Sequence, residues 1–124
     1  MDFSVNLQDY RLKEAFTINL FCDLFDVLHE HEKTINDILY ISIDNKNFKP
    51  QKILDLFKGI TYERGYSGPW INQSLRIVLK NGDFIIRGEY DGSEWFEYMV
   101  APRLDEKLED FDNYEGLITI KYNF

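Results

Sequence analysis

The sequence predicts a single α+β domain, with helices packed on one face of an antiparallel sheet of about five strands. Three observations support this prediction. Apolar residues recur with helical spacing between Asp9 and Glu32, whereas they alternate with polar residues between Ser74 and Val100. Two dipeptides that favour tight turns, Asn81-Gly82 and Asp91-Gly92, divide the alternating stretch into three runs. The 124 residues are 44% hydrophobic, which is enough for one domain, residues 1–124, with its own core.

The first predicted element is a helix of roughly 20 residues within Asp9–Glu32. Its polar side carries Asp23, Asp26 and Glu30 at positions i, i+3 and i+7, which form an acidic stripe. Such a stripe is either a solvated helix face or a docking surface. We therefore regard these three acidic residues as candidate partner-binding residues.

Residue types that bind metals or act as nucleophiles are sparse in this chain. Cys22 is the single cysteine and lies among apolar residues, so we expect a small core side chain and no disulfide within the chain. His29 and His31 are two residues apart, and a helix directs them to different faces. We predict no metal site, no cofactor and no catalytic residue.

A strand and a second helix are expected next. The β-branched and aromatic residues of Asp37–Ile43 predict a strand, which ends in the polar turn Asp44–Asn47. Pro50 in the first turn and Gly59 after the last turn predict a short helix over Lys49–Lys58.

The alternating stretch predicts three antiparallel strands, Ser74–Lys80, Asp83–Tyr90 and Glu94–Val100. We expect a two-residue loop at Asn81-Gly82. At Asp91-Gly92 we expect a three-residue loop, because a two-residue loop would bring a glutamate onto the apolar face. The expected core face then comprises Leu75, Ile77, Leu79, Phe84, Ile86, Phe96, Tyr98 and Val100.

The opposite face of these strands has a mixed composition. A cross-strand ion pair between Arg87 and Glu97 would make it a solvated face. Trp and Arg are also frequent anchors of protein interfaces, so an exposed Trp95 beside Arg87 would favour a partner-binding face. We expect Arg76, Arg87, Glu89 and Glu97 to keep solvent access. The full expected face is Arg76, Val78, Ile85, Arg87, Glu89, Trp95, Glu97 and Met99.

The stretch Gly59–Asn72 is predicted to be an irregular loop, because it contains two glycines and a proline within five residues. Its large aromatic residues, Tyr62, Tyr66 and Trp70, either cover the edge of the core or form an aromatic binding loop. The Gly-Lys-Ser/Thr ending of a phosphate-binding loop is absent from this stretch.

The chain after the three strands is strongly acidic. Leu104, Leu108 and Phe111 have the spacing i, i+4 and i+7, which predicts a short amphipathic helix within Arg103–Gly116. A last strand is expected over Leu117–Tyr122. The order of the acidic residues is not that of a calcium loop. We regard the following as candidate partner-binding residues: Asp105, Glu106, Glu109, Asp110 and Asp112.

The formal net charge of −8 limits the choice of partners. Residues 1–44 carry nine acidic and three basic residues, whereas residues 45–102 carry seven and eight. Such a chain repels nucleic acid phosphates, and its acidity either favours a basic protein surface or serves solubility alone, which is the commoner reason. No apolar run reaches the roughly 18 residues of a membrane span, and no signal-peptide pattern is visible. We therefore expect a cytoplasmic protein without a membrane or nucleic acid partner, and no motif predicts an enzyme.

The stretch Gly88–Tyr98, GEYDGSEWFEY, preceded by the loop Gly65–Trp70, resembles small uncharacterised proteins of bacteria and their prophages. In size and acidity the chain is also similar to immunity proteins of bacterial toxin systems and to phage inhibitors of host defence of the anti-CRISPR kind. This resemblance implies a protein that neutralises another protein by occupying its surface. The first hypothesis is thus an inhibitor whose acidic patches meet the basic surface of a nuclease or other nucleic-acid-binding effector.

A second hypothesis comes from a different class of function. A small-ligand module would hold a nucleotide-like or other planar molecule between Tyr66, Trp70 and Trp95. The acidity of the chain disfavours ligands that carry phosphate. A homodimer through a free sheet edge is compatible with either hypothesis.

Overall fold

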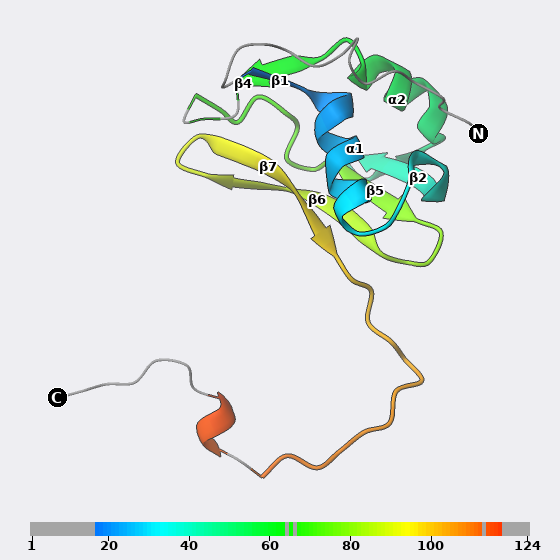
Figure 1. The fold of residues 1–124 in the computed structure, drawn as a ribbon, viewed down its shortest axis with the longest axis vertical. Coiled ribbons are helices and arrows are strands. Elements are labelled where there is room, and N and C mark those ends of the chain that lie inside the picture. Colours follow the sequence, from blue (N-terminus) through cyan, green and yellow to red (C-terminus); the bar gives the residue numbers. More distant parts are fainter. Residues whose placement is uncertain (1–16, 64, 66, 113, 118–124) are drawn as a thin grey trace, which may run out of the picture.

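A computed structural model describes residues 17–63, 65, 67–112 and 114–117. Its centre is a five-stranded antiparallel sheet with the strand order β3-β2-β5-β6-β7, which confirms the predicted α+β class (Figure 1). Two α-helices, α1 (Leu20–Glu30) and α2 (Pro50–Phe57), pack against the sheet. The strands of the sheet are β2 (Ile38–Ile43), β3 (Lys46–Phe48), β5 (Arg76–Leu79), β6 (Phe84–Tyr90) and β7 (Ser93–Met99).

A second, two-stranded sheet was not expected from the sequence. It pairs β1 (Thr17–Asn19) with β4 (Thr61–Glu63), and the predicted first helix begins only after β1, at Leu20. Asn19 fixes this start, because its side chain accepts a hydrogen bond from the backbone N–H of Cys22 at 3.1 Å. Residues 9–16 of the predicted helix lie outside the described residues.

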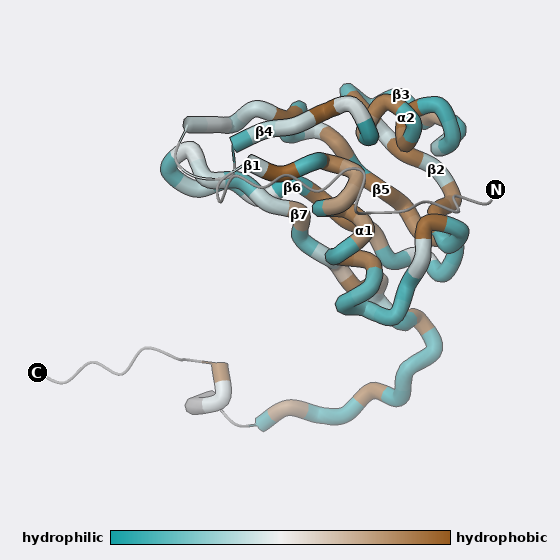
Figure 2. The backbone as a smooth tube through the Cα atoms, turned by 45° about the horizontal axis from the view of Figure 1, so that its top comes forward, coloured by the Kyte–Doolittle hydropathy of each residue, from teal (hydrophilic) through white to brown (hydrophobic). Residues whose placement is uncertain are grey.

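The hydrophobic core lies between the sheet and the two helices. The expected helix over Lys49–Lys58 is present as α2, and Pro50 occupies its first turn. Figure 2 shows hydrophobic residues along the central strands and the facing helix. The fully buried apolar side chains include Leu24 and Leu28 of α1, Leu54 of α2, and Ile41, Ile77, Leu79 and Ile85 of the sheet. Cys22 is also buried, as expected for a small core side chain.

The first hairpin has a longer loop than the sequence suggested. Ile77 pairs with Ile85, and Leu79 meets Asp83 across three intervening residues. Asp83 favours this arrangement, because its carboxylate accepts hydrogen bonds from Tyr98 and from the backbone N–H of Ala101. These two bonds hold the pKa of Asp83 below its ordinary value. The prediction of a two-residue loop is therefore wrong.

The second hairpin has a shorter loop than the sequence suggested. Tyr90 pairs with Ser93, so only Asp91 and Gly92 form the loop. Both residues have positive φ, 51° and 81°, which is the conformation of a tight hairpin turn that Asn, Asp and Gly favour. Glu97 does lie opposite Ile86, but both side chains point away from the helices, so the Glu97 carboxylate stays out of the core.

The one-residue shift turns every side chain of β6 to the opposite face. Ile85 and Arg87 face the helices, whereas Phe84 and Ile86 lie on the other face, which reverses the predicted assignment. The expected solvent access of Arg87 is wrong, because this residue is only 6% exposed. Arg76, Glu89 and Glu97 are exposed as expected. Val100, predicted in the core, is 69% exposed.

The chain after β7 leaves the body of the molecule (Figure 1). No helix forms between Leu104 and Phe111, in contrast to the prediction. A helix there would place like charges at i, i+4, as in Asp105–Glu109 and Glu106–Asp110, and such a short helix is marginal in water. A 3-10 turn spans Tyr114–Leu117, so Leu117 begins no strand there, and residues 118–122 of the expected last strand lie outside the described residues.

Within the described part of the chain, no helix is both long and apolar enough to cross a membrane.

Candidate partner-binding site

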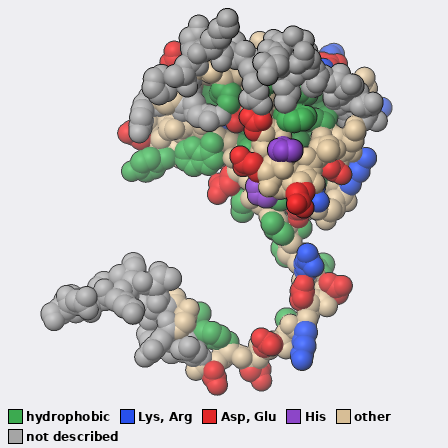
Figure 3. Space-filling model, viewed as in Figure 1, with side chains coloured by type: hydrophobic (Ala, Val, Ile, Leu, Met, Phe, Trp, Pro, Cys, Tyr) green, Lys and Arg blue, Asp and Glu red, His purple; other side chains and the backbone are tan. Residues whose placement is uncertain are grey.

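The acidic segment 103–112 is the most exposed part of the described chain, and we call it the acidic tail. Its apolar side chains are largely exposed: Leu104 is 96% exposed, Leu108 is 90% exposed and Phe111 is 62% exposed. Figure 3 shows acidic and hydrophobic side chains interleaved along this segment. Within it Arg103 pairs with Glu106 at 3.8 Å between exposed side chains, and such pairs contribute little to stability.

All five candidate residues of the tail, Asp105, Glu106, Glu109, Asp110 and Asp112, are exposed. They are available to a partner, and the tail makes them accessible together with three apolar side chains. This combination of charge and uncovered apolar surface is typical of a segment that orders when it binds.

The predicted acidic stripe of the first helix is only partly present on the surface. Glu30 is exposed and Asp26 is half-buried, but Asp23 is 6% exposed. Asp23 accepts a hydrogen bond from the Tyr62 hydroxyl and lies 3.7 Å from Nη1 of Arg87. Asp23, the first residue of the expected i, i+3, i+7 stripe, is therefore held in internal contacts and is not available on the surface.

Arg87 belongs to a buried polar cluster on the face of the sheet that is turned toward the helices. Its guanidinium lies 4.4 Å from the ring centre of Phe96 and 5.2 Å from that of Tyr62. Nη2 of Arg87 donates a hydrogen bond to Glu94 at 3.0 Å, and both side chains are fully buried. Burial, followed by the negative charge of Asp23, raises the pKa of Tyr62 to about 12. Arg87 and Asp23 are thus structural residues, not exposed contacts for a partner.

Glu94 connects this cluster to the loop that precedes β5. Its carboxylate accepts hydrogen bonds from the backbone N–H groups of Trp70 and Ile71, the second at 3.1 Å. No local pattern predicts this role, since the alternating pattern places Glu94 at the start of a strand and assigns it no partner. Its long-range contacts, 23 and 24 residues away, have no local signature.

Trp70 and Trp95 are both accessible, with 57% and 39% of their surfaces exposed. Trp95 lies on the sheet face that points away from the helices, where its indole packs across Gly88 and a Cβ on that glycine would be 2.4 Å from Nε1. Trp70 instead is held by its backbone to the buried Glu94 and donates its indole N–H to Ser67. Tyr66, the third aromatic residue of the ligand hypothesis, lies outside the described residues.

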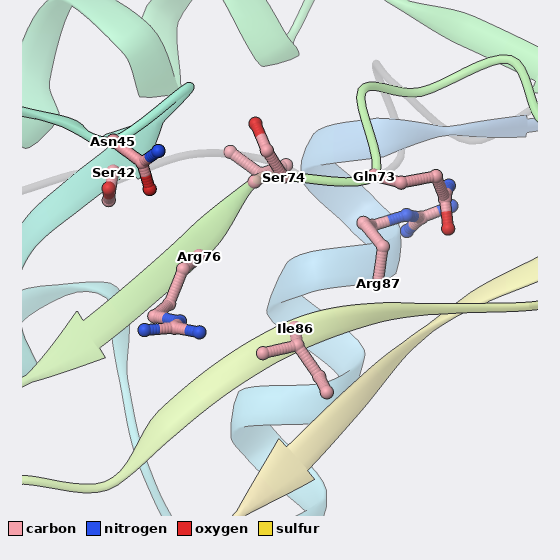
Figure 4. A pocket seen from close by; sticks show the side chains of 8 residues that line it. Ser42, Asn45, Gln73, Ser74, Arg76, Ile86 and Arg87 are labelled. Atoms are coloured by element: carbon pink, nitrogen blue, oxygen red, sulfur yellow. The ribbon is translucent and has the colours of Figure 1, made fainter.

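A shallow polar pocket of about 290 Å³ lies beside β5 and β6. Figure 4 shows the side chains that line it, with Ile86 and Arg87 pointing to opposite sides of β6. Neither Trp70 nor Trp95 is among them, so this pocket gives no support to an aromatic ligand site. It is lined by Ser42, Asn45, Gln73, Ser74, Leu75, Arg76, Ile86 and Arg87.

In the part of the chain that the structure describes, no three His, Cys, Asp or Glu side chains gather as a metal site requires. No protein-family model, curated protein or solved structure matches the chain. The candidate site therefore rests on the chain's own geometry, in which the acidic tail presents charge and apolar surface together.

Proposed function

We propose that this protein binds a basic protein through its acidic tail and inhibits that partner by occupying its surface. The observation that carries the proposal is the exposure of Leu104 and Leu108, at 96% and 90%, within a run of acidic residues. The partner class is a nuclease or another effector that binds nucleic acid, because such proteins present the basic surface that an acidic segment complements.

Two effects oppose a helix in the free tail: repulsion between its like charges and the marginal stability of a short helix in water. Binding removes both. Basic side chains of the partner neutralise the like-charge pairs Asp105–Glu109 and Glu106–Asp110, which otherwise oppose a helix. A helix over the tail then aligns Leu104, Leu108 and Phe111 on one face, where they enter an apolar groove beside the basic surface. The charges supply rapid encounter, and the three apolar side chains supply the desolvated contact.

The test uses the full chain as bait in a bacterial lysate, followed by purification of the captured protein. The association rate of that protein is then measured from about 0.1 M to 1 M salt, where the Debye length falls from ~10 Å to ~3 Å. We expect the rate to fall steeply with salt, and to fall again when Glu109, Asp110 and Asp112 are changed to Lys. A variant with Leu104→Ala and Leu108→Ala should instead dissociate faster.

A matched control carries the same change in charge on the body of the protein. Glu32, Asp55 and Glu63 are exposed, and their change to Lys should have a smaller effect than the three changes in the tail. A rate that ignores both salt and the tail substitutions would reject docking through the tail. A captured protein that binds but keeps its full nuclease or nucleic-acid-binding activity would reject inhibition.

A further inference from the structure

One face of the sheet points away from the helices, and we call it the open face. It carries a band of apolar side chains. Residues that lie directly opposite one another on neighbouring strands form rows across the sheet. The first row crosses four strands and consists of Tyr40, Val78, Phe84 and Met99. The next row consists of Ser42, Arg76, Ile86 and Glu97, and a third row pairs Gly88 with Trp95. The first row, which is apolar, therefore crosses four of the five strands, from β2 to β7, and Ile86 and Trp95 add apolar surface beside it.

The open face is separate from the hydrophobic core. None of its apolar residues belongs to the core cluster or to the partly buried residues that pack against it. Its large apolar side chains are half-buried, and Arg76, Trp95 and Glu97 are exposed. Because Gly88 leaves space for the Trp95 indole, this aromatic ring lies across the sheet and extends the apolar surface.

The charges on this face have a pattern that complements itself. Arg76 and Glu97 flank Ile86 on the two neighbouring strands, one on each side, about 10 Å apart at the usual strand spacing. Neither makes an ion pair with another described residue; Arg76 instead lies over the Phe84 ring at 5.5 Å. A surface with one charge of each sign on either side of an apolar centre matches a rotated copy of itself.

We propose that the open face binds the open face of a second copy of this chain, with a two-fold axis parallel to β6. Two stacked sheets lie about 10 Å apart, within reach of long side chains from both. This axis sets Ile86 against Ile86 and Phe84 against Phe84. It also brings Arg76 of each copy opposite Glu97 of the other copy, so two ion pairs border an apolar centre.

Charge distinguishes the second copy from the other occupants. The acidic tail of the same chain would bring its carboxylates against Glu97, and only Arg76 would attract it. A basic protein finds no net negative charge on this face, since Arg76 and Glu97 balance. The face is small compared with the 20 to 30 residues per side of a standard interface, so we expect a dimer of about micromolar affinity. This inference does not depend on the proposed function.

The test measures the oligomeric state of the full chain by sedimentation, from low micromolar to about 0.2 mM protein. The wild-type chain should be a dimer at the upper end of this range. Arg76→Glu and Glu97→Arg should each weaken the dimer by at least ~30-fold, since two attractive pairs become repulsive. A mixture of the two variants should dimerise again, because each copy then meets the opposite charge on the other.

Circular dichroism of each variant provides the control for folding, and both positions are exposed, so we expect unchanged spectra. A wild-type chain that stays monomeric at the highest concentration would overturn the proposal, and cross-linking of the tail to this face would then assign the face to the tail. A dimer that tolerates either substitution, or a mixture that stays monomeric, would overturn the proposed axis.

Discussion

Arg87 lies at the centre of the polar contacts between the sheet and the helices. It pairs with a fully buried Glu94, lies near Asp23, and stacks against two aromatic rings. Buried charges are costly to desolvate, and they are tolerated when hydrogen bonds satisfy them. Here Glu94 has three donors, one from Arg87 and two from the loop backbone, so the carboxylate remains compatible with burial.

The change Arg87→Met tests this account. It leaves the Glu94 carboxylate buried without its cation, and we expect a loss of about 3–5 kcal/mol in the free energy of unfolding. The additional change Glu94→Gln should recover part of that loss, because the remaining side chain is neutral. Denaturant unfolding followed by circular dichroism measures both values. As a control, Arg103→Met at an exposed position should stay within about 0.5 kcal/mol, and an equally small loss at Arg87 would contradict the account.

The elements show which parts of the fold could be predicted from the sequence. Helical spacing indicated α1 but extended it over the strand β1, and Pro50 located α2, since these signals are local. The loop at Asn81-Gly82 was assigned the wrong length, because its register depends on Asp83 being satisfied by Tyr98 and Ala101, 15 and 18 residues further on. The strands β1 and β4 have three residues each, and only their pairing with each other defines them.

The candidate site, too, could be predicted only where the signal in the sequence is local. The acidic tail was recognised from its composition, and its residues are exposed as a partner site requires. Its missing helix could also have been foreseen from the like charges at i, i+4. The burial of Arg87 could not, because a one-residue shift in a strand moves each side chain to the other face and nothing local signals that shift. The burial of Asp23 on α1 could not either, because it depends on contacts with Tyr62 and Arg87, which are distant in the sequence.

Two neighbouring residues of β6 provide a direct test of the register. Ile85 is fully buried, whereas Phe84 is half-buried on the open face. We expect Ile85→Ala to cost about 2–5 kcal/mol of stability and Phe84→Ala about 1–2 kcal/mol, although Phe is the larger side chain. Chemical denaturation at low protein concentration gives both values without a contribution from association. A larger loss at Phe84 than at Ile85 would mean that the sequence-based register was right.

The described residues divide into a packed body and an acidic tail whose apolar side chains are mostly exposed. The body holds the core between the sheet and the helices, while the tail exposes Leu104 and Leu108 almost completely. A chain that keeps such side chains in water gains no folding stability from them. This separation assigns folding to the body and, in our proposal, binding to the tail.

Stability measurements can verify this division. Replacing Leu104 and Leu108 by Ala should change the free energy of unfolding by less than about 0.5 kcal/mol. The matched substitution Leu24→Ala, in the core, should cost about 2–5 kcal/mol. Thermal and urea unfolding of the three proteins provide the comparison. A loss above about 1 kcal/mol in the tail variant would show that the tail packs on the body in solution.

The bonds from the loop to Glu94 also determine how the molecule opens. The amide hydrogens of Trp70 and Ile71 belong to no helix or strand, yet their acceptor is a completely buried carboxylate on β7. Their exchange with solvent deuterium therefore requires the loop to separate from the β6–β7 hairpin. The two amides should exchange at the slow rate of the hairpin itself, and the loop and hairpin should open together as one cooperative unit.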